Sequence, residues 1–204
     1  MIRPLPAVLV MCALALVACR EEHPELAPKT EELLRAKADA RIAAVLRQPG
    51  SPPFAAVVVF GSDVFLHQSA MLERNGISLL DSFDNVAILL LDARVTPPLL
   101  ADDSVRKIHY LCPPTLLARF HPAFLLSALR LFGRGKEKEP VPFFIRFRTP
   151  PAEADVKAVQ DAGFTVKSRD GAVLTVSGPP AGFSRLLEMD GIVYYEGASN
   201  LRTM

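Results

Sequence analysis

The chain has almost no net charge, no tryptophan and only three cysteines among its 204 residues. Its 23 Lys and Arg nearly balance its 22 Asp and Glu, so no overall positive charge draws it to nucleic acid. Three cysteines are too few for the disulfide framework of a small secreted domain. Half of the residues are hydrophobic, which excludes an intrinsically disordered chain and suits one domain or two small ones.

The common signatures of catalysis and metal binding are also missing. His67, His109 and His121 are scattered and have no metal-ligand spacing, so we expect surface or packing roles for them. No Gly-x-Ser-x-Gly nucleophile motif is present, and the run 133–136 lacks the spacing of a phosphate-binding loop. We therefore expect no enzymatic activity, no cofactor, no metal site and no nucleic-acid partner.

Residues 1–19 have the pattern of an export signal. Arg3 is followed by an apolar run at 7–17, which is too short to span a bilayer but has the length of a signal-peptide core. The run ends in Leu-Val-Ala-Cys, with the cysteine at position 19. This segment resembles the bacterial lipoprotein signal, or lipobox, which implies removal of residues 1–18 and acylation of Cys19. An ordinary secretory signal cut nearby and a short N-terminal membrane helix are the alternatives.

Lipidation would change the composition of the mature chain. Arg3 would be lost, which leaves a neutral protein, and Cys12 would leave with the signal. Cys112 would then be the one free thiol, so no intrachain disulfide is expected. Stable anchoring requires two hydrophobic signals, and bacterial lipoproteins generally carry more than one acyl chain. We expect a lipid-anchored protein of the bacterial cell envelope, with Arg20 in place of Asp favouring the outer membrane over the inner.

The sequence from Cys19 onward predicts a tether at 19–28 followed by a helix at 29–48. Thr30 is a candidate cap, and the two acids after it favour the positive end of a helix. Apolar residues then recur at helical spacing until the Pro- and Gly-rich run at 49–53 ends the pattern. Packing against the first domain and docking on a partner are both open roles for this helix.

Two later stretches, 53–111 and 142–197, resemble each other in the order of their signals. Both begin with Pro-Phe and an apolar strand, and both continue into a helix that ends at glycine. Both then contain two strands around an Asp turn, a Pro-Pro pair, a short helix and a final strand that begins at aspartate. The matching positions are Phe54 and Phe143, Gly76 and Gly163, Asp84 and Asp170, Pro97 and Pro179, and Asp103 and Asp190.

Each stretch therefore predicts the element order β-α-β-β-α-β. This is the ferredoxin-like arrangement, in which four antiparallel strands bury one face under two helices and leave the other face open. We expect an α+β chain with tandem ferredoxin-like domains at 53–112 and 141–204. Chance likeness of two unrelated α+β segments is the alternative.

The segment between them, 113–140, is an apolar insert or linker. Its stretch 116–132 is rich in Leu and Phe, with Arg119, His121 and Arg130 interspersed. One interpretation is a helical insert that packs between the domains. The other is an amphipathic segment on the membrane surface, with basic residues toward anionic headgroups.

The last strand of the second stretch carries a more specific pattern. In order it contains Asp190, Ile192, Tyr194, Tyr195 and Glu196. With the preceding helix and hairpin it resembles the inhibitor-I9 type of subtilisin propeptide. The first stretch fits less well, since its corresponding strand reads Lys-Ile-His at 107–109.

The resemblance implies a protease-binding role. In that family the open sheet face docks on the protease and the C-terminal tail lies in the active-site cleft like a substrate. It implies that the last strand and the tail at 197–204 form the binding region, although the tail also has the length of an ordinary frayed terminus. The binding residues so implied are Tyr194, Tyr195, Glu196, Asn200, Leu201 and Arg202. No protease domain follows in this chain, so inhibition would act on a separate molecule.

The sequence thus predicts a membrane-anchored envelope lipoprotein that binds another protein, with inhibition or chaperoning of a subtilisin-like protease as the specific hypothesis. The alternative is a structural envelope lipoprotein without inhibitory activity. In that case the segment 116–132 would contact the membrane or another envelope protein.

Overall fold

The structure, a computed structural model, describes residues 26–48 and 50–198. The expected signal peptide, Cys19 and the tail residues Asn200, Leu201 and Arg202 lie outside the described residues.

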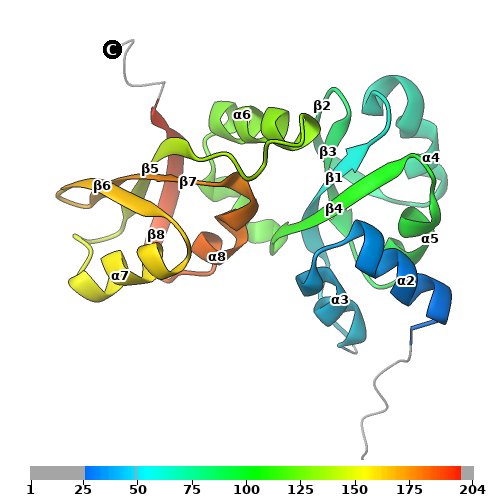
Figure 1. Ribbon diagram of the computed structural model, residues 1–204, viewed down its shortest axis with the longest axis horizontal. Coiled ribbons are helices and arrows are strands. Elements are labelled where there is room, and N and C mark those ends of the chain that lie inside the picture. The colour runs from blue at the N-terminus through cyan, green and yellow to red at the C-terminus, as the bar shows by residue number, and fades with distance from the viewer. Residues whose placement is uncertain (1–25, 49, 199–204) are drawn as a thin grey trace, which may run out of the picture.

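The protein is an α+β chain with two four-stranded antiparallel sheets, side by side in Figure 1. The first sheet has the order β2-β3-β1-β4 and the second has the order β6-β7-β5-β8. The strands of the first sheet are β1 (Phe54–Phe60), β2 (Ser78–Phe83), β3 (Val86–Leu91) and β4 (Val105–Cys112). Those of the second are β5 (Val141–Phe147), β6 (Thr165–Asp170), β7 (Val173–Gly178) and β8 (Ile192–Gly197).

Helices precede each sheet and connect its strands. In the first half they are α2 (Pro28–Lys37), α3 (Ala40–Arg47), the π-helical turn η1 (Val64–Gln68), α4 (Ser69–Arg74) and α5 (Thr96–Ala101). In the second half they are the 3-10 helix η2 (Pro114–Arg119), α6 (Pro122–Gly133), α7 (Glu153–Asp161), the 3-10 turn η3 (Pro180–Gly182) and α8 (Phe183–Leu187).

The single helix expected at 29–48 is wrong, because the segment breaks into α2 and α3 at Ala38 and Asp39. Ala38 forms a parallel bridge with Ile108 at the free edge of β4. The Asp39 carboxylate accepts hydrogen bonds from the backbone N–H of Ile42 (3.1 Å) and of Tyr110 (2.6 Å). The first bond caps α3, and the second ties that cap to β4, so pairing with the strand replaces one turn of helix.

The two sheets correspond residue by residue at a constant spacing of 87 positions. Val59 pairs with Val86 in the first sheet, and Arg146 pairs with Val173 in the second. This register corrects three details of the expected match. Phe54 corresponds to Val141 rather than to Phe143, and Asp84 corresponds to Gly171 rather than to Asp170. The Pro-Pro pairs are not equivalent, since 97–98 lie inside α5 whereas 179–180 lead into η3.

The repeat also begins earlier than expected. Before the second sheet, Phe120 forms a parallel bridge with Tyr195 of β8, and the backbone N–H of His121 donates to the Tyr195 carbonyl (2.9 Å). Ala38 and Asp39 make the same two contacts with Ile108 of β4. The segment 113–140 is therefore the counterpart of the leading helices α2 and α3, and not a separate linker.

Helix α6 joins the cores of the two halves. Phe124 near its start stacks on Phe143 of the second sheet, with ring centroids 5.2 Å apart. Further along, α6 packs against β1 and β3 of the first sheet. Leu129 and Phe132 are buried in the same cluster as Val57 of β1, on the face of that sheet opposite α4 and α5. Of the two interpretations of 116–132, packing between the domains is the one that the structure shows.

No helix among the described residues is long and apolar enough to cross a membrane.

Candidate protein-interaction face

The two sheets differ in how many of their faces are covered. Alternate residues of β1 fall into two buried clusters, one with α4 and α5 and the other with α6, so both faces of the first sheet are covered. In β5 only every second residue is buried, with Phe143, Ile145 and Phe147 on the helix side. The opposite face of the second sheet has no such cover among the described residues.

This open face is a shallow concavity of about 480 Å³ that crosses all four strands of the second sheet. Its floor combines aromatic rings, hydroxyl groups and charges of both signs. The residues that line it are Phe144, Arg146, Ser168, Asp170, Val173, Thr175, Tyr194 and Glu196. Such a mixture is typical of an interaction surface, whereas a sheet face that packs against a helix is mainly apolar.

The charged groups of the open face are not used internally. Arg146 lies opposite Tyr194 in the strand pairing, and Phe144 lies opposite Glu196. Within the described part of the chain, Arg146, Asp170 and Glu196 form no ion pair with one another or with any neighbour. Their charges are therefore available to a binding partner.

The first sheet provides an internal comparison. The positions of Phe144 and Arg146 are occupied there by Val57 and Val59, which are buried beneath α6. The position of Thr175 is occupied by Ile88, which is also buried. The same backbone surface thus carries a packing face in the first half and a polar, aromatic face in the second.

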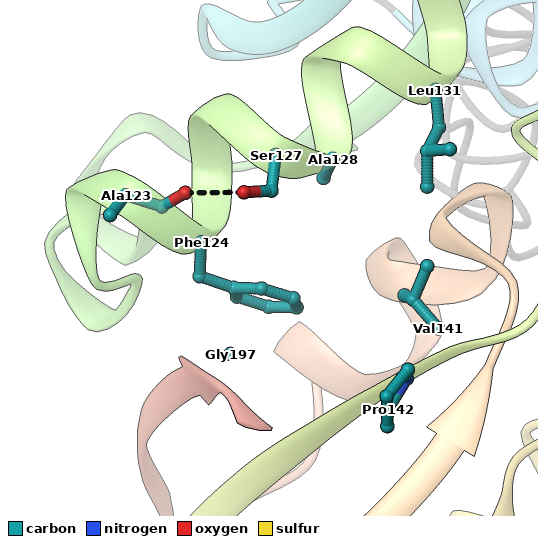
Figure 2. A pocket seen from close by; sticks show the side chains of 8 residues that line it. All are labelled: Ala123, Phe124, Ser127, Ala128, Leu131, Val141, Pro142 and Gly197. Atoms are coloured by element: carbon teal, nitrogen blue, oxygen red, sulfur yellow. Dashed lines mark hydrogen bonds between the residues drawn. The ribbon is translucent and has the colours of Figure 1, made fainter. Parts of the chain in front are cut away.

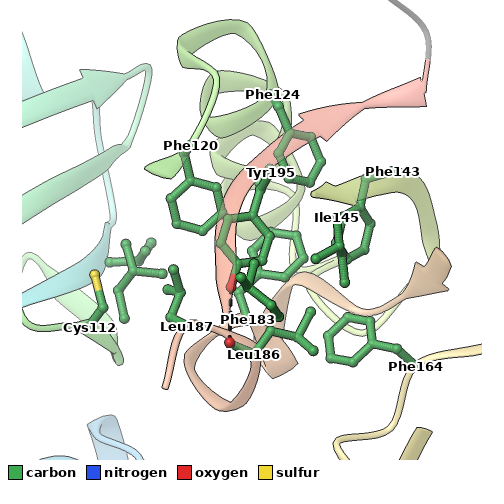
Figure 3. Close-up of a cluster of buried hydrophobic side chains, with 14 of the residues drawn as sticks. Cys112, Phe120, Phe124, Phe143, Ile145, Phe164, Phe183, Leu186, Leu187 and Tyr195 are labelled. Atoms are coloured by element: carbon green, nitrogen blue, oxygen red, sulfur yellow. Dashed lines mark hydrogen bonds between the residues drawn. The ribbon is translucent and has the colours of Figure 1, made fainter. Parts of the chain in front are cut away.

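Of the residues implied by the propeptide resemblance, Tyr195 is wrongly placed in the binding surface. Its side chain is 1% exposed, and its hydroxyl donates a hydrogen bond of 2.9 Å to the carbonyl of Leu186. Figure 3 shows the ring within the aromatic cluster, where its centroid lies 5.0 Å from that of Phe120. Burial raises the pKa of this phenol. Tyr195 is a core residue because it faces the helices, the side opposite Tyr194.

Tyr194 and Glu196 do line the open face, as the resemblance implies. The Tyr194 ring also meets His121 edge-on, with centroids 6.4 Å apart, which holds it at the border of the face. Phe144, Thr175 and Asp170 are site residues that the resemblance does not imply, although the period-two alternation of β5 and β7 places the first two on this face.

Cys112 and His109, two reactive side chains of the described residues, lie away from the open face in packed surroundings. Cys112 is buried, and burial raises the pKa of its thiol to about 12, so it is a poor nucleophile. The His109 ring packs at a tilt against the Phe132 ring, with centroids 5.0 Å apart, and burial lowers the pKa of His109. In residues 26–48 and 50–198 no group of three or more His, Cys, Asp or Glu is arranged to hold a metal ion.

Comparison with known protein families, with curated protein sequences and with solved structures finds no match to this chain.

Proposed function

We propose that the protein is a lipid-anchored envelope protein that binds another protein through the open face of its second sheet. The observation that carries this proposal is the contrast between the two sheets. At equivalent positions, the first sheet has Val57 and Val59 beneath a helix, whereas the second has a half-buried Phe144 and an exposed Arg146. A charged side chain there is compatible with folding only because no helix covers it.

The specific partner that we propose is a subtilisin-like protease, inhibited or chaperoned by a pair of ferredoxin-like domains. The strand order β2-β3-β1-β4 and the element order β-α-β-β-α-β support this domain type in both halves. The propeptide-like pattern of β8 supports the second half as the docking domain. Tyr194 and Glu196 would contact the protease, and the tail residues Asn200, Leu201 and Arg202 would enter its cleft.

The test of partner choice is inhibition of a panel of subtilisin-like proteases by residues 20–204, which include every described element. We expect inhibition that falls at least tenfold in Arg146→Glu, because the reversed charge lies at the centre of the face. Arg185→Glu is the matched control, since Arg185 is an exposed arginine on α8, away from this face. Removal of residues 199–204 should abolish inhibition but leave binding measurable.

Failure of all proteases to respond would overturn the protease hypothesis. Binding to some other envelope protein that is lost in Arg146→Glu and kept in Arg185→Glu would retain the interaction face and change its partner.

The lipid anchor is a separate part of the proposal. It is supported by the lipobox-like pattern at 1–19 and by the eight residues, 20–27, between Cys19 and the first residue of α2, Pro28, which would supply a tether. Metabolic labelling with palmitate should mark the wild-type protein and not Cys19→Ser. Equal labelling of both would contradict lipidation at this residue.

The alternative function is a structural envelope lipoprotein that uses 116–132 as its contact surface. Four large apolar side chains of that segment lie in the core and are not available for such a contact. Phe120, Phe124, Leu129 and Phe132 are each 4% exposed or less. Flotation of residues 20–204 with liposomes tests what is left of this alternative, and we expect the protein to stay in solution.

A further inference from the structure

A second hollow, separate from the open face, lies between α6 and the second sheet. It is an apolar groove of about 220 Å³ at the point where β8 ends. Figure 2 shows α6 on one side of it and the start of β5 on the other. Its lining residues are Ala123, Phe124, Ser127, Ala128, Leu131, Val141, Pro142 and Gly197.

The first half of the molecule fills the corresponding place with its own side chains. There Tyr110 stacks on Phe54, with centroids 5.4 Å apart, and the guanidinium of Arg41 lies 4.4 Å from the Tyr110 centroid. Leu46 is buried in the same cluster as Phe54.

In the second half each of these four large residues is replaced by a smaller one. In the sheets, Tyr110 corresponds to Gly197 and Phe54 corresponds to Val141. The helices before each sheet are aligned on the bridged residues Ala38 and Phe120. In that alignment Arg41 corresponds to Ala123 and Leu46 corresponds to Ala128. These four reductions in size leave a groove open at the place that the first half fills, although Phe124 is larger than its counterpart Ile42.

The chemistry of the lining selects an apolar occupant. No charged side chain lines the groove. The one hydroxyl, that of Ser127, is already committed to the carbonyl of Ala123 at 2.8 Å (Figure 2). Gly197 is needed for the groove's shape, because a Cβ on it would come within 3.3 Å of the Phe124 ring.

We propose that this groove receives the chain's own C-terminal segment, with the Leu201 side chain as its occupant. Gly197 is itself part of the lining, and Leu201 follows only four positions later. Four extended residues reach about 13 Å. The lining runs along α6 from Ala123 to Leu131, a rise of about 12 Å, so the reach matches the groove. Leu201 and Met204 are the large apolar residues of 199–204, and Leu201 is the nearer.

This inference does not rest on the proposed function, but it bears on it. A tail held in the groove is not available to enter a protease cleft, so the tail would have to leave the groove before it could enter the cleft. The tests below include no subtilisin-like protease, so failure of inhibition and failure of docking are distinguishable.

The first test is trimming of residues 20–204 by a carboxypeptidase, followed by intact-mass measurement. In the wild type we expect trimming to slow about tenfold when it reaches Leu201, because a buried side chain is cleaved only after it leaves the groove. Ala123→Arg and Ala128→Leu restore the residues of the first half and fill the groove without altering the tail. Both should remove the pause. Ala154→Arg on α7 is the control for an added arginine on an exposed helix position and should keep it.

The second test uses the fluorescence of the apolar dye anilinonaphthalene sulfonate. Wild-type protein should bind little dye, and Leu201→Ser should bind at least fivefold more, because the groove would then be empty. Adding Ala128→Leu to Leu201→Ser should return binding to the wild-type level. No trimming pause, or equal dye binding by the wild type and Leu201→Ser, would overturn the proposal. Thermal unfolding identifies any variant that fails to fold. Ala123 is exposed, so we expect Ala123→Arg to fold and to keep the test informative if Ala128→Leu does not fold.

Discussion

Adjacent residues of β8 have opposite roles, and the backbone decides which is which. Tyr195 faces the helices and donates its hydroxyl to the Leu186 carbonyl, whereas Tyr194 lines the open face. The propeptide resemblance treats the two tyrosines alike, because a motif records residue types and not the side of the sheet on which they lie.

Tyr195→Phe should lower the free energy of unfolding by about 1–2 kcal/mol, because the buried Leu186 carbonyl loses its donor. Tyr194→Phe should change it by less than about 0.5 kcal/mol. Urea unfolding followed by circular dichroism measures both. Equal effects of the two substitutions would contradict the burial of Tyr195.

His109 should make stability depend on pH. Burial against Phe132 lowers its pKa below the ordinary value of 6.5, so the folded state binds a proton less readily than the unfolded state. Stability is therefore fully present above about pH 6.5 and declines as the pH falls through that value, by at most about 1.4 kcal/mol per pH unit. His109→Gln should flatten this slope. An unchanged slope between pH 7 and 5.5 would assign it to other groups.

At the scale of elements, α6 is the helix that covers the second face of the first sheet. The first half of α6 packs on the second sheet, where Phe124 stacks on Phe143. The second half of α6 buries Val57 and its neighbours in the first sheet. An isolated amphipathic helix looks the same in sequence whether it covers a membrane or a sheet. The contacts of Leu129 and Phe132 resolve that ambiguity.

Leu129→Ala should therefore cost about 2–5 kcal/mol of stability, as expected for a leucine that is 1% exposed between two sheets. Ser127→Ala, on the same helix and exposed, should cost less than about 0.5 kcal/mol. Chemical unfolding of the two variants gives the comparison. A cost below 1 kcal/mol for Leu129→Ala would show that α6 is not an essential cover.

At the scale of the whole molecule, the two halves share one continuous core. The cluster that contains Val57 and Ile88 of the first sheet also contains Phe143 and Leu174 of the second (Figure 3 shows the part around Phe143). Arg41 on α3 also forms an ion pair with Glu188 after α8, which joins the halves on another side.

We expect the halves to unfold as one unit, with equal calorimetric and van't Hoff enthalpies in a single transition. A chain that ends at Cys112 would lack α6 and expose the apolar face of the first sheet, so it should aggregate. Two separate transitions, or a soluble folded first half, would contradict a shared core.

Much of the local structure follows from the sequence. The apolar run at 54–60, the glycines at 76 and 163 in the left-handed region and the turn at Asp84 lie where their patterns predict. The second turn lies one position later than predicted, at 171–172, because Asp170 is the last residue of β6. The break at Ala38 and Asp39 was not predictable, because it depends on the free edge of a strand 70 positions later. The interaction face was half predictable, since alternation identifies Phe144 and Arg146 but does not say that a helix is absent above them.

The sequence alone determined the element order of each half, the repeat and the export-like pattern at 1–19, because each depends on residues close together in the chain. Only the tertiary structure decided that α6 covers the second face of the first sheet, while the corresponding face of the second sheet stays open. It also decided that Tyr195 is buried and that Gly197 and Ala128 border a groove where Tyr110 and Leu46 fill the first half. These features depend on contacts between distant segments, and the physical reason is that burial is a property of what packs above a surface rather than of the surface's own sequence.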